Sequence, residues 1–318
     1  MSSDWTRRQW LAGIPAVAGT AFASRLLPAQ QAADDKPARD EPFGYCLNTS
    51  TLSGQKLDLV QLVDIAAKAG YQAIEPWVRE LDAHVKNGGN LKVLGQRIRD
   101  RGLVIPSVIA FFEWIVDDNE RRKKGFEEAR RSMELVQQIG GHRIAAPPSG
   151  ATSQTDLDLL QAAERYRALL ELGDKMGVVP QVEFWGSSRA LSRLGEAILV
   201  AMESGHPQAC VLADIYHLYK GGSSVDGLRL LSGTAMHVVH CNDYPAQPPR
   251  ASISDAQRIY PGEGIAPLKT IFRTLRQIGF RGMLSLELFN RDYWKQDAAT
   301  VARTGLEKMR AAAQSSFR

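Results

Sequence analysis

Short apolar runs and longer amphipathic segments alternate along most of the chain. Each run is followed by a segment with apolar residues at helical spacing, and most of these segments stop at a glycine, which is favoured just beyond a helix end. Such continuously apolar runs are typical of parallel strands covered by helices. The pattern predicts an α/β fold, a single (β/α)8 TIM barrel over residues 43–318. The expected strands are residues 43–48, 71–77, 103–111, 142–148, 178–185, 209–217, 236–243 and 282–289.

Carboxylates and imidazoles collect at one end of these runs. Six runs finish at or near such a residue, whereas no run begins with an equivalent set. The residues are Glu75, Glu113, Glu183, Asp214 with His217, His240 with Asp243, and Glu287. Because the active sites of these barrels lie at the carboxyl ends of the strands, the pattern predicts a site at that rim.

Four of these residues form a plausible ligand set for one divalent cation. Glu183, Asp214, His240 and Glu287 offer three carboxylates and one imidazole, which suit Mn²⁺, Mg²⁺, Co²⁺ or Zn²⁺. Without a cation, converging buried acids would repel one another or remain unsatisfied. We therefore predict one bound divalent metal ion. The alternative is that each residue is a separately hydrogen-bonded acid or core histidine.

Composition places the chain among soluble globular proteins, with 44% hydrophobic and 23% charged residues. The formal net charge is +4 and no basic stripe is visible in the sequence, so we do not expect a nucleic-acid partner. The three cysteines, Cys46, Cys210 and Cys241, lie in or beside apolar runs. We expect them to be buried free thiols.

Residues 1–33 resemble a twin-arginine export signal. Arg7 and Arg8 precede an Ala/Gly-rich apolar segment, and small residues further on offer cleavage sites. Residues 34–42 are polar and contain proline, as in a linker. The apolar segment after the two arginines is too short and too rich in small residues for an ordinary membrane anchor. The pattern predicts a periplasmic or extracellular protein with no membrane span after signal removal; a disordered basic tail is the alternative.

Four segments together resemble a known family. They are VEFW (182–185), DIYH (214–217), HCND (240–243) followed by YPGEG (260–264), and LSLELFN (284–290). The chain from about Phe43 onward resembles the sugar phosphate isomerase/epimerase group of xylose isomerase-like TIM barrels. Its relatives include ketose 3-epimerases, hydroxypyruvate isomerase and inosose dehydratase. Endonuclease IV shares this barrel, but its extra histidine ligands have no counterpart here.

The resemblance implies a role for each matching residue. In the ketose epimerases a Glu, an Asp, a His and a Glu from the last four strands hold one metal, which maps onto Glu183, Asp214, His240 and Glu287. The histidine of Asp-x-x-His contacts substrate, which corresponds to His217. An arginine in the loop after the seventh strand helps to hold the sugar. Arg250 is the better match and Arg258 the alternative.

The resulting functional prediction is a metal-dependent isomerase or epimerase that acts on a keto sugar or sugar derivative through a cis-enediolate. Glu183 and Glu287 would lie on opposite faces of the substrate as acid and base. One alternative is a lyase or dehydratase on 3-keto glycosides or inososes with the same metal site. A second is a non-catalytic sugar-binding barrel. Export favours a free sugar or a 3-keto glycoside over a sugar phosphate.

Further substrate contacts are expected from the rim. We expect Trp185 and Trp114 to stack on the sugar, and Glu75 and Glu113 to accept its hydroxyl groups. The alternatives are barrel packing for the rings and solvated rim acids for the glutamates. A homodimer or homotetramer is compatible with these expectations.

Overall fold

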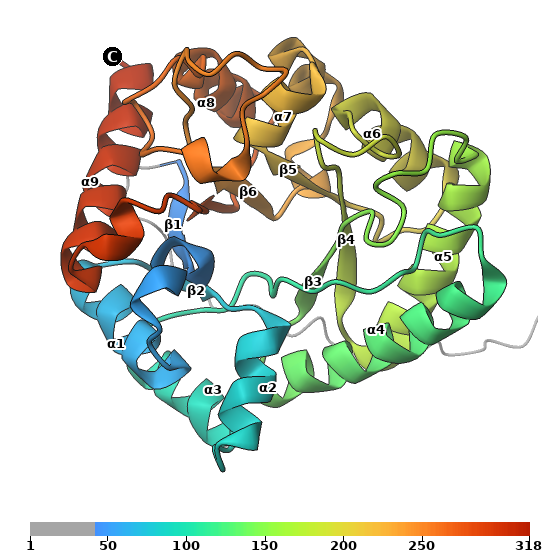
Figure 1. Cartoon of the computed structure of the whole chain (residues 1–318), viewed down its shortest axis with the longest axis horizontal. Helices are drawn as coiled ribbons and strands as arrows, with labels where there is room; N and C mark the ends of the chain where they lie inside the picture. The colour runs from blue at the N-terminus through green and yellow to red at the C-terminus, as the bar shows by residue number, and fades with distance from the viewer. Residues whose placement is uncertain (1–41) are drawn as a thin grey trace, which may run out of the picture. The chain divides into compact units, whose positions relative to one another are not determined.

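Parallel strands form a ring at the centre of the fold, and helices surround it (Figure 1). The computed structural model describes residues 42–318, so the predicted signal and nearly all of the predicted linker lie outside the described residues. Seven regular strands are hydrogen-bonded in the order β2-β1-β7-β6-β5-β4-β3. The predicted barrel is confirmed. The strands are β1 (Gly44–Asn48), β2 (Ala73–Glu75), β3 (Arg143–Ala146), β4 (Val179–Glu183), β5 (Val211–Asp214), β6 (Val238–Cys241) and β7 (Met283–Leu286).

The predicted third strand closes the ring between β2 and β3 without forming a regular ladder. Val104 accepts a hydrogen bond from the Ile74 amide at 3.0 Å, and Val108 donates to Arg143 at 3.1 Å. Pro106 lies between these contacts and has no N–H to donate, which interrupts the ladder. The third strand position of the barrel is therefore filled by a segment that pairs with its neighbour through isolated β-bridges, Ala73 with Val104 and Trp77 with Ile109.

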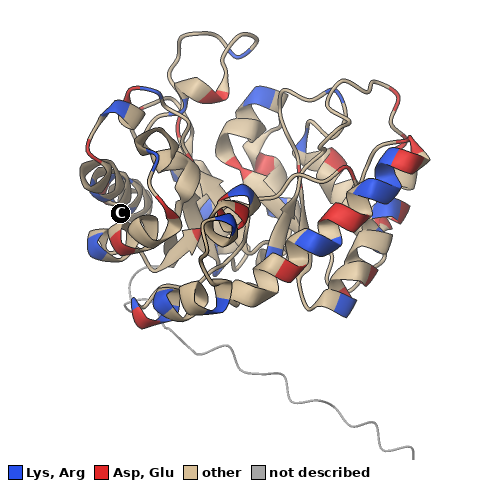
Figure 2. Cartoon of the chain, turned by 60° about the horizontal axis from the view of Figure 1, so that its bottom comes forward, with Lys and Arg blue, Asp and Glu red and all other residues tan. Residues whose placement is uncertain are grey.

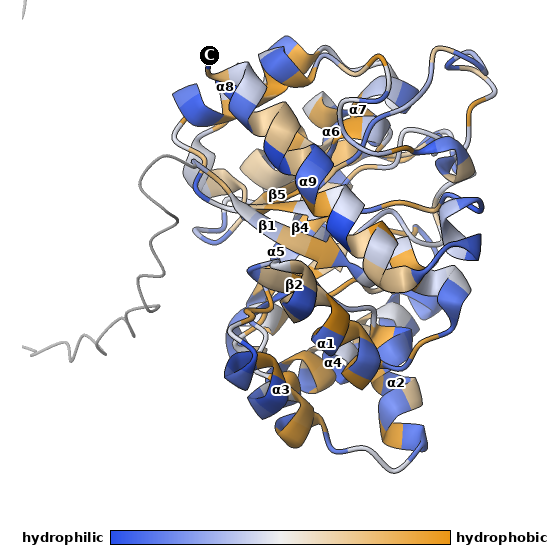
Figure 3. Cartoon of the chain, turned by 90° about the vertical axis from the view of Figure 1, so that its left-hand side faces the viewer, coloured by the Kyte–Doolittle hydropathy of each residue, from blue (hydrophilic) through white to orange (hydrophobic). Residues whose placement is uncertain are grey.

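Nine α-helices are found in residues 42–318. The sequence pattern missed α2, which starts directly after Trp77, and α7, which starts directly after Asp214. In Figure 3 the outer helix α9 carries both polar and apolar stretches, whereas β5 is largely apolar. The helices are α1 (Leu59–Ala69), α2 (Val78–Lys86), α3 (Leu91–Asp100), α4 (Asn119–Ile139), α5 (Leu159–Met176), α6 (Leu194–Glu203), α7 (Ile215–Gly221), α8 (Leu268–Gln277) and α9 (Ala298–Ser316). Short 3₁₀ helices are η1 (Thr49–Gln55), η2 (Val225–Leu230), η3 (Gly233–Ala235), η4 (Asp255–Gln257) and η5 (Tyr293–Lys295).

Local sequence signals set the ends of these helices. The Asp58 carboxylate accepts the Gln61 amide at 2.8 Å, and the Gln61 side chain accepts the Asp58 amide at 3.0 Å. This reciprocal cap starts α1, and Gly70 ends it in the left-handed conformation at φ 92°. Asp118, Asp158 and Asp297 cap the N-termini of α4, α5 and α9 by accepting backbone amides, without the reciprocal bond.

Strand register brings the polar strand ends together. Asp214 is paired with His240, His240 with Ser285, and Asn48 with Glu75. These residues belong to five different strands, yet they lie at one level of the barrel because parallel pairing aligns the carboxyl ends. The predicted clustering at one rim is therefore a direct result of register.

The outside of the barrel is polar and carries both signs of charge. Figure 2 shows Lys and Arg interspersed with Asp and Glu along the outer helices. Between residues 42 and 318, no helix has the length and apolar character needed to cross a membrane. All three cysteines are buried and free, as predicted.

Candidate active site at the carboxyl ends of the strands

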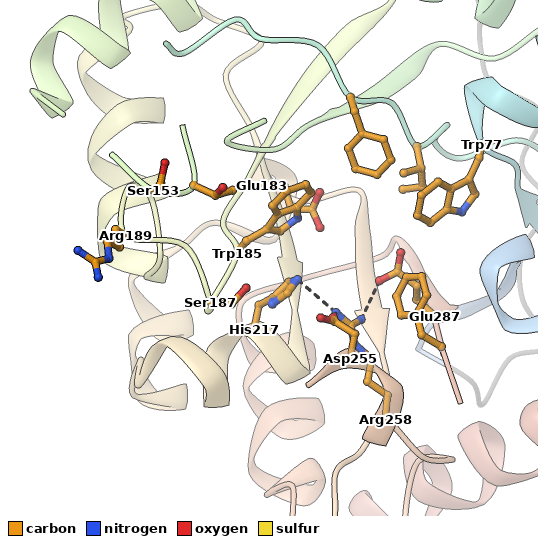
Figure 4. Close-up of a pocket in the computed structure, with 14 residues that line it drawn as sticks. Trp77, Ser153, Glu183, Trp185, Ser187, Arg189, His217, Asp255, Arg258 and Glu287 are labelled. Atoms are coloured by element: carbon orange, nitrogen blue, oxygen red, sulfur yellow. Dashed lines mark hydrogen bonds and ion pairs between the residues drawn. The ribbon is translucent and has the colours of Figure 1, made fainter. Parts of the chain in front are cut away.

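A cavity of about 640 Å³ opens at the predicted rim (Figure 4). This volume is within the usual range for small-molecule sites. Four of the predicted residues line it, namely Glu183, Trp185, His217 and Glu287. Asp214 and His240 are fully buried. His240 lies next to Asp214 and next to Glu287, which lines the cavity.

His240 is the point on which the predicted ligand set converges. Its Nδ1 atom lies 3.2 Å from Glu287 Oε2, 3.5 Å from Asp214 Oδ2 and 3.6 Å from Glu183 Oε1. Among the described residues this buried nitrogen finds no hydrogen-bond partner. The structure thus brings together all four residues expected to bind a metal.

The geometry of this cluster fits a divalent cation. Asp214, His240 and Glu287 each offer a ligand atom within 4.8 Å of the other two. Bonds of about 2.1 Å to one ion would place neighbouring ligand atoms about 3.0–3.4 Å apart. The observed separations around His240 Nδ1 lie close to this range, and in the neutral imidazole this nitrogen would be available as a metal ligand.

Glu75 lies behind His240 and not in the cavity. Its Oε2 atom is 3.2 Å from His240 Nε2 and accepts hydrogen bonds from Ser285 Oγ at 2.6 Å and Asn48 Nδ2 at 3.0 Å. Its side chain is fully buried and does not line the cavity, where it was predicted to accept a substrate hydroxyl. Glu75 instead orients the imidazole and leaves Nδ1 directed at the three carboxylates.

The electrostatics of this pair are reciprocal. Burial raises the pKa of Glu75, but the charge and hydrogen bond of His240 outweigh it, so the pKa lies below its usual value. Burial lowers the pKa of His240, but Glu287 and Glu75 outweigh it and raise that pKa well above its usual value. Burial together with neighbouring carboxylates raises the pKa of Glu183 to about 8. The carboxylates thus concentrate negative charge around His240; the Arg258 guanidinium binds two of them, and a divalent cation would relieve the remaining repulsion.

The Asp-x-x-His spacing has a local cause. Asp214 ends β5 and is also the N-cap of α7, where its Oδ1 accepts the amide of His217 at 2.8 Å. The capping geometry places the His217 side chain at the same rim, with Nδ1 accepting from the Gly186 amide at 3.2 Å. Burial lowers the pKa of His217, which favours a neutral imidazole.

Arg258, and not Arg250, reaches the cavity. Its Nη1 atom lies 2.8 Å from both Asp214 Oδ2 and Glu287 Oε2, and its Nη2 atom lies 3.2 Å from His217 Nε2. Arg250 is exposed and lies beside Gly222 outside the cavity. The structure therefore places the alternative residue, Arg258, at the cavity and Arg250 outside it.

The contacts of Asp243 explain why Arg258, and not Arg250, lies at the cavity. The Asp243 carboxylate accepts four backbone amides, from Tyr244 and Ala266 at Oδ1 and from Gly262 and Gly264 at Oδ2, at 2.8–3.0 Å. Its backbone also pairs with Ile259 in an antiparallel bridge. This folds the long loop back over the strand ends and places Arg258, the residue before Ile259, inside the barrel mouth.

Glu113 and Trp114 do not reach the cavity. Arg121 binds the Glu113 carboxylate through two hydrogen bonds, at 2.7 and 2.8 Å, on the surface. Trp114 is fully buried, donates its indole N–H to the Pro147 carbonyl at 2.8 Å and packs on Tyr166. The chain after the third strand position turns both side chains away from the cavity, where substrate contact was predicted.

Two further residues of the site, Asn48 and Asp255, were not predicted from the sequence. Asn48 connects the two halves of the site by donating to Glu75 and to Glu287. It ends the first apolar run, so the signal that identified the acids was present for it too. Asp255 lines the cavity and pairs with Arg258, but it lies in a long loop that carries no periodic pattern.

Comparison with known proteins agrees with this architecture. A family model described as the xylose isomerase-like TIM barrel matches residues 63–312. The chain belongs to this family. Inosose isomerase of Bacillus licheniformis is 27% identical over 277 residues, which are 82% of this chain and 95% of that protein.

Two further similarities extend the comparison. The 3-dehydroshikimate dehydratase of Pseudomonas putida is 23% identical over 263 residues, covering 82% of this chain and 40% of that protein. A crystal structure of a protein named IolI, with a bound zinc atom, superimposes with a TM-score of 0.79 at 20% identity and covers 86% of this chain and 99% of that one. The proteins to which this chain is similar thus include an isomerase and a dehydratase.

Proposed function

We propose that this protein is a divalent-metal-dependent isomerase or epimerase of a keto sugar or a related polyhydroxy ketone. The observation that carries the proposal is a pair of opposed glutamates at one cavity. Glu183 ends β4 and Glu287 follows β7, while Asp214 and His240 lie on the two strands between them. The glutamates therefore flank the centre of the site from opposite sides.

Each residue has a role that its position supports. Asp214, His240, Glu183 and Glu287 would hold the cation. A divalent cation there would act as a Lewis acid on the substrate carbonyl. One glutamate removes the proton from the carbon next to the carbonyl, and the other returns a proton from the opposite face. His217 and Arg258 line the same cavity and hydrogen-bond to substrate oxygens.

The relatives support the choice of substrate class. The names inosose isomerase and 3-dehydroshikimate dehydratase both describe enzymes of hydroxylated ketones. Proton removal next to a ketone is the step that isomerisation, epimerisation and dehydration share. A dehydration therefore differs from the proposed reaction only in what happens after that step.

The test is hydrogen exchange. Protein loaded with Mn²⁺ or Co²⁺ is incubated in D₂O with a panel of ketoses, inososes and 3-keto glucosides, and the mixture is followed by NMR and mass spectrometry. We expect deuterium at the carbon next to the carbonyl together with a new isomer of unchanged composition. Glu183→Gln and Glu287→Gln should each slow exchange by about 10²–10⁴-fold, whereas Glu113→Gln, a surface acid, should exchange at the wild-type rate.

Other outcomes decide against the proposal in specific ways. A product lighter by one water would identify a dehydratase. Binding of the ketones without exchange at full metal occupancy would identify a sugar-binding barrel.

Export remains a separate proposal that rests on the sequence of residues 1–33. Replacing Arg7 and Arg8 by lysine should retain the protein in the cytoplasmic fraction of an expressing bacterium. Unchanged export of that variant would refute the twin-arginine assignment.

A further inference from the structure

Four aromatic side chains line the cavity in a continuous series of ring contacts. Trp77, Phe111, Trp185 and Phe289, here called the aromatic wall, all line it. Ring centroids are 5.2 Å apart for Trp77 and Phe111, 5.6 Å for Phe111 and Trp185, and 6.1 Å for Trp77 and Phe289. The rings come from four places along the chain: the ends of β2, β4 and β7 and the segment that occupies the third strand position.

Packing of the barrel core accounts for Trp77, which is 6% exposed and belongs to a buried cluster with Ile109, but not for the other three rings. Phe111 is 46% exposed, although it is one of the largest apolar side chains in the protein. Trp185 and Phe289 are only partly buried. Apolar surface of this kind, left open inside a cavity and next to polar groups, is typical of a ligand-binding surface.

A single sugar ring cannot cover the aromatic wall. A sugar has two C–H faces and can stack on at most two rings, whereas the wall has four. Neighbouring rings are inclined by 56°, 59° and 83°, so they form a curved surface and not a flat slot. The cavity, at about 640 Å³, is in the range that accepts drug-sized ligands. Space and apolar surface are thus left over once a sugar ring lies at the acid–base centre.

The chemistry of the wall favours an apolar ring as the second occupant. The indole N–H of Trp77 already donates to Asn48 Oδ1 at 2.9 Å, and the two phenylalanines offer no polar group. The hydroxyl groups of a second sugar would find partners elsewhere in the cavity lining, at Thr152, Ser153, Ser187 and Arg189, and not on the ring faces of the wall. An aromatic group would pack on the same rings in edge-to-face and offset contacts.

We propose that the aromatic wall is a subsite for an aromatic group carried by the substrate, so that the substrate is an aryl keto-glycoside. The inference rests on the proposed function, since it places the keto-sugar ring between Glu183 and Glu287. The two parts of the site are continuous. Asn48 bonds both Trp77 and Glu287, and the Arg258 guanidinium lies 5.1 Å from the centre of the Phe289 ring. Figure 4 shows Trp77, Trp185, Glu183 and Glu287 around one cavity.

The test compares matched substrates. Methyl and phenyl 3-keto-β-glucosides are supplied to the metal-loaded protein, and kcat/KM is measured for deuterium exchange next to the carbonyl. We expect the phenyl compound to be preferred about tenfold, and Phe111→Ala to reduce that preference to about twofold. Phe111 is chosen because its exposure makes the substitution harmless to the core. Leu230→Ala, at a side chain that is 84% exposed and outside the cavity, is the control and should keep the preference.

A binding measurement separates this proposal from the proposed function. Phenyl β-glucoside and methyl β-glucoside carry no ketone, so their dissociation constants report the subsite without any turnover. Tighter binding of the phenyl compound that Phe111→Ala abolishes supports the subsite even if no ketone ever exchanges deuterium. Equal binding of the two glucosides, or equal kcat/KM for the two ketones, overturns the subsite while leaving the isomerase proposal intact.

Discussion

Replacing Glu75 by glutamine tests whether a residue outside the cavity controls the metal site. The substitution keeps the shape of the side chain and removes its charge. The Oε2 atom of Glu75 accepts from three partners, including His240 Nε2 at 3.2 Å, while its Oε1 atom has no hydrogen-bond partner among the described residues. The variant would therefore weaken the bond that orients the imidazole and bury an unpaired amide N–H₂ group.

The expected magnitude follows from the change in that bond. Hydrogen bonds to a charged group contribute about 1.5–3 kcal/mol and neutral ones about 0.5–1.5 kcal/mol, so the loss is about 1–2 kcal/mol. This corresponds to a metal dissociation constant about tenfold larger than that of the wild type, at the lower end of the effects seen for residues that support metal-binding histidines. The buried amide group should also lower the free energy of unfolding by about 1–3 kcal/mol.

The assay is calorimetric titration of metal-stripped protein with Mn²⁺, at a temperature where circular dichroism shows both proteins folded. Glu113→Gln is the matched control, because it removes the same charge from another strand-end glutamate that is paired with Arg121 on the surface. It should leave the dissociation constant unchanged. A dissociation constant for Glu75→Gln within twofold of wild type would refute the positioning role, and an equal loss in both variants would reduce it to a general effect of charge.

Three other predictions concern stability and substrate contact. Asp243→Asn should lower the free energy of unfolding by about 2–4 kcal/mol in urea titrations, because an amide nitrogen cannot accept the backbone N–H groups that the carboxylate binds. Trp114→Ala should lower it by about 3–5 kcal/mol because the side chain is fully buried, whereas Trp185→Ala should mainly weaken substrate use; the reverse order would contradict the assignment of the two rings. Burial lowers the pKa of His237 to about 4, so between the ordinary pKa of 6.5 and pH 4 the unfolded chain takes up a proton that the folded chain does not, and stability falls with pH. With His237→Gln, the free energy of unfolding should fall by about 2 kcal/mol less between pH 6.5 and pH 4, after allowance for the partial exposure of the side chain. If the variant and the wild type lose stability equally over this pH range, burial of His237 does not lower its pKa as argued.

Two strand-end glutamates show where prediction from sequence stops. Glu75 and Glu113 carry the same local signal, a carboxylate at the end of an apolar run. The fold buries one against His240 and leaves the other on the surface with Arg121. A run of apolar residues says that a strand ends there, but it does not say whether the last side chain points to the barrel axis or away from it.

The sequence by itself determined the barrel, the rim that carries the polar groups and the convergence of Glu183, Asp214, His240 and Glu287. Those features depend on periodicity and on parallel pairing, which are local or repeated properties of the chain. Only the tertiary structure decided that Arg258 and not Arg250 enters the cavity, because that choice depends on how the loop folds onto Asp243. It also decided which aromatic rings face the ligand space. Long loops and side-chain direction follow from contacts between distant residues, and no local pattern in the sequence encodes them.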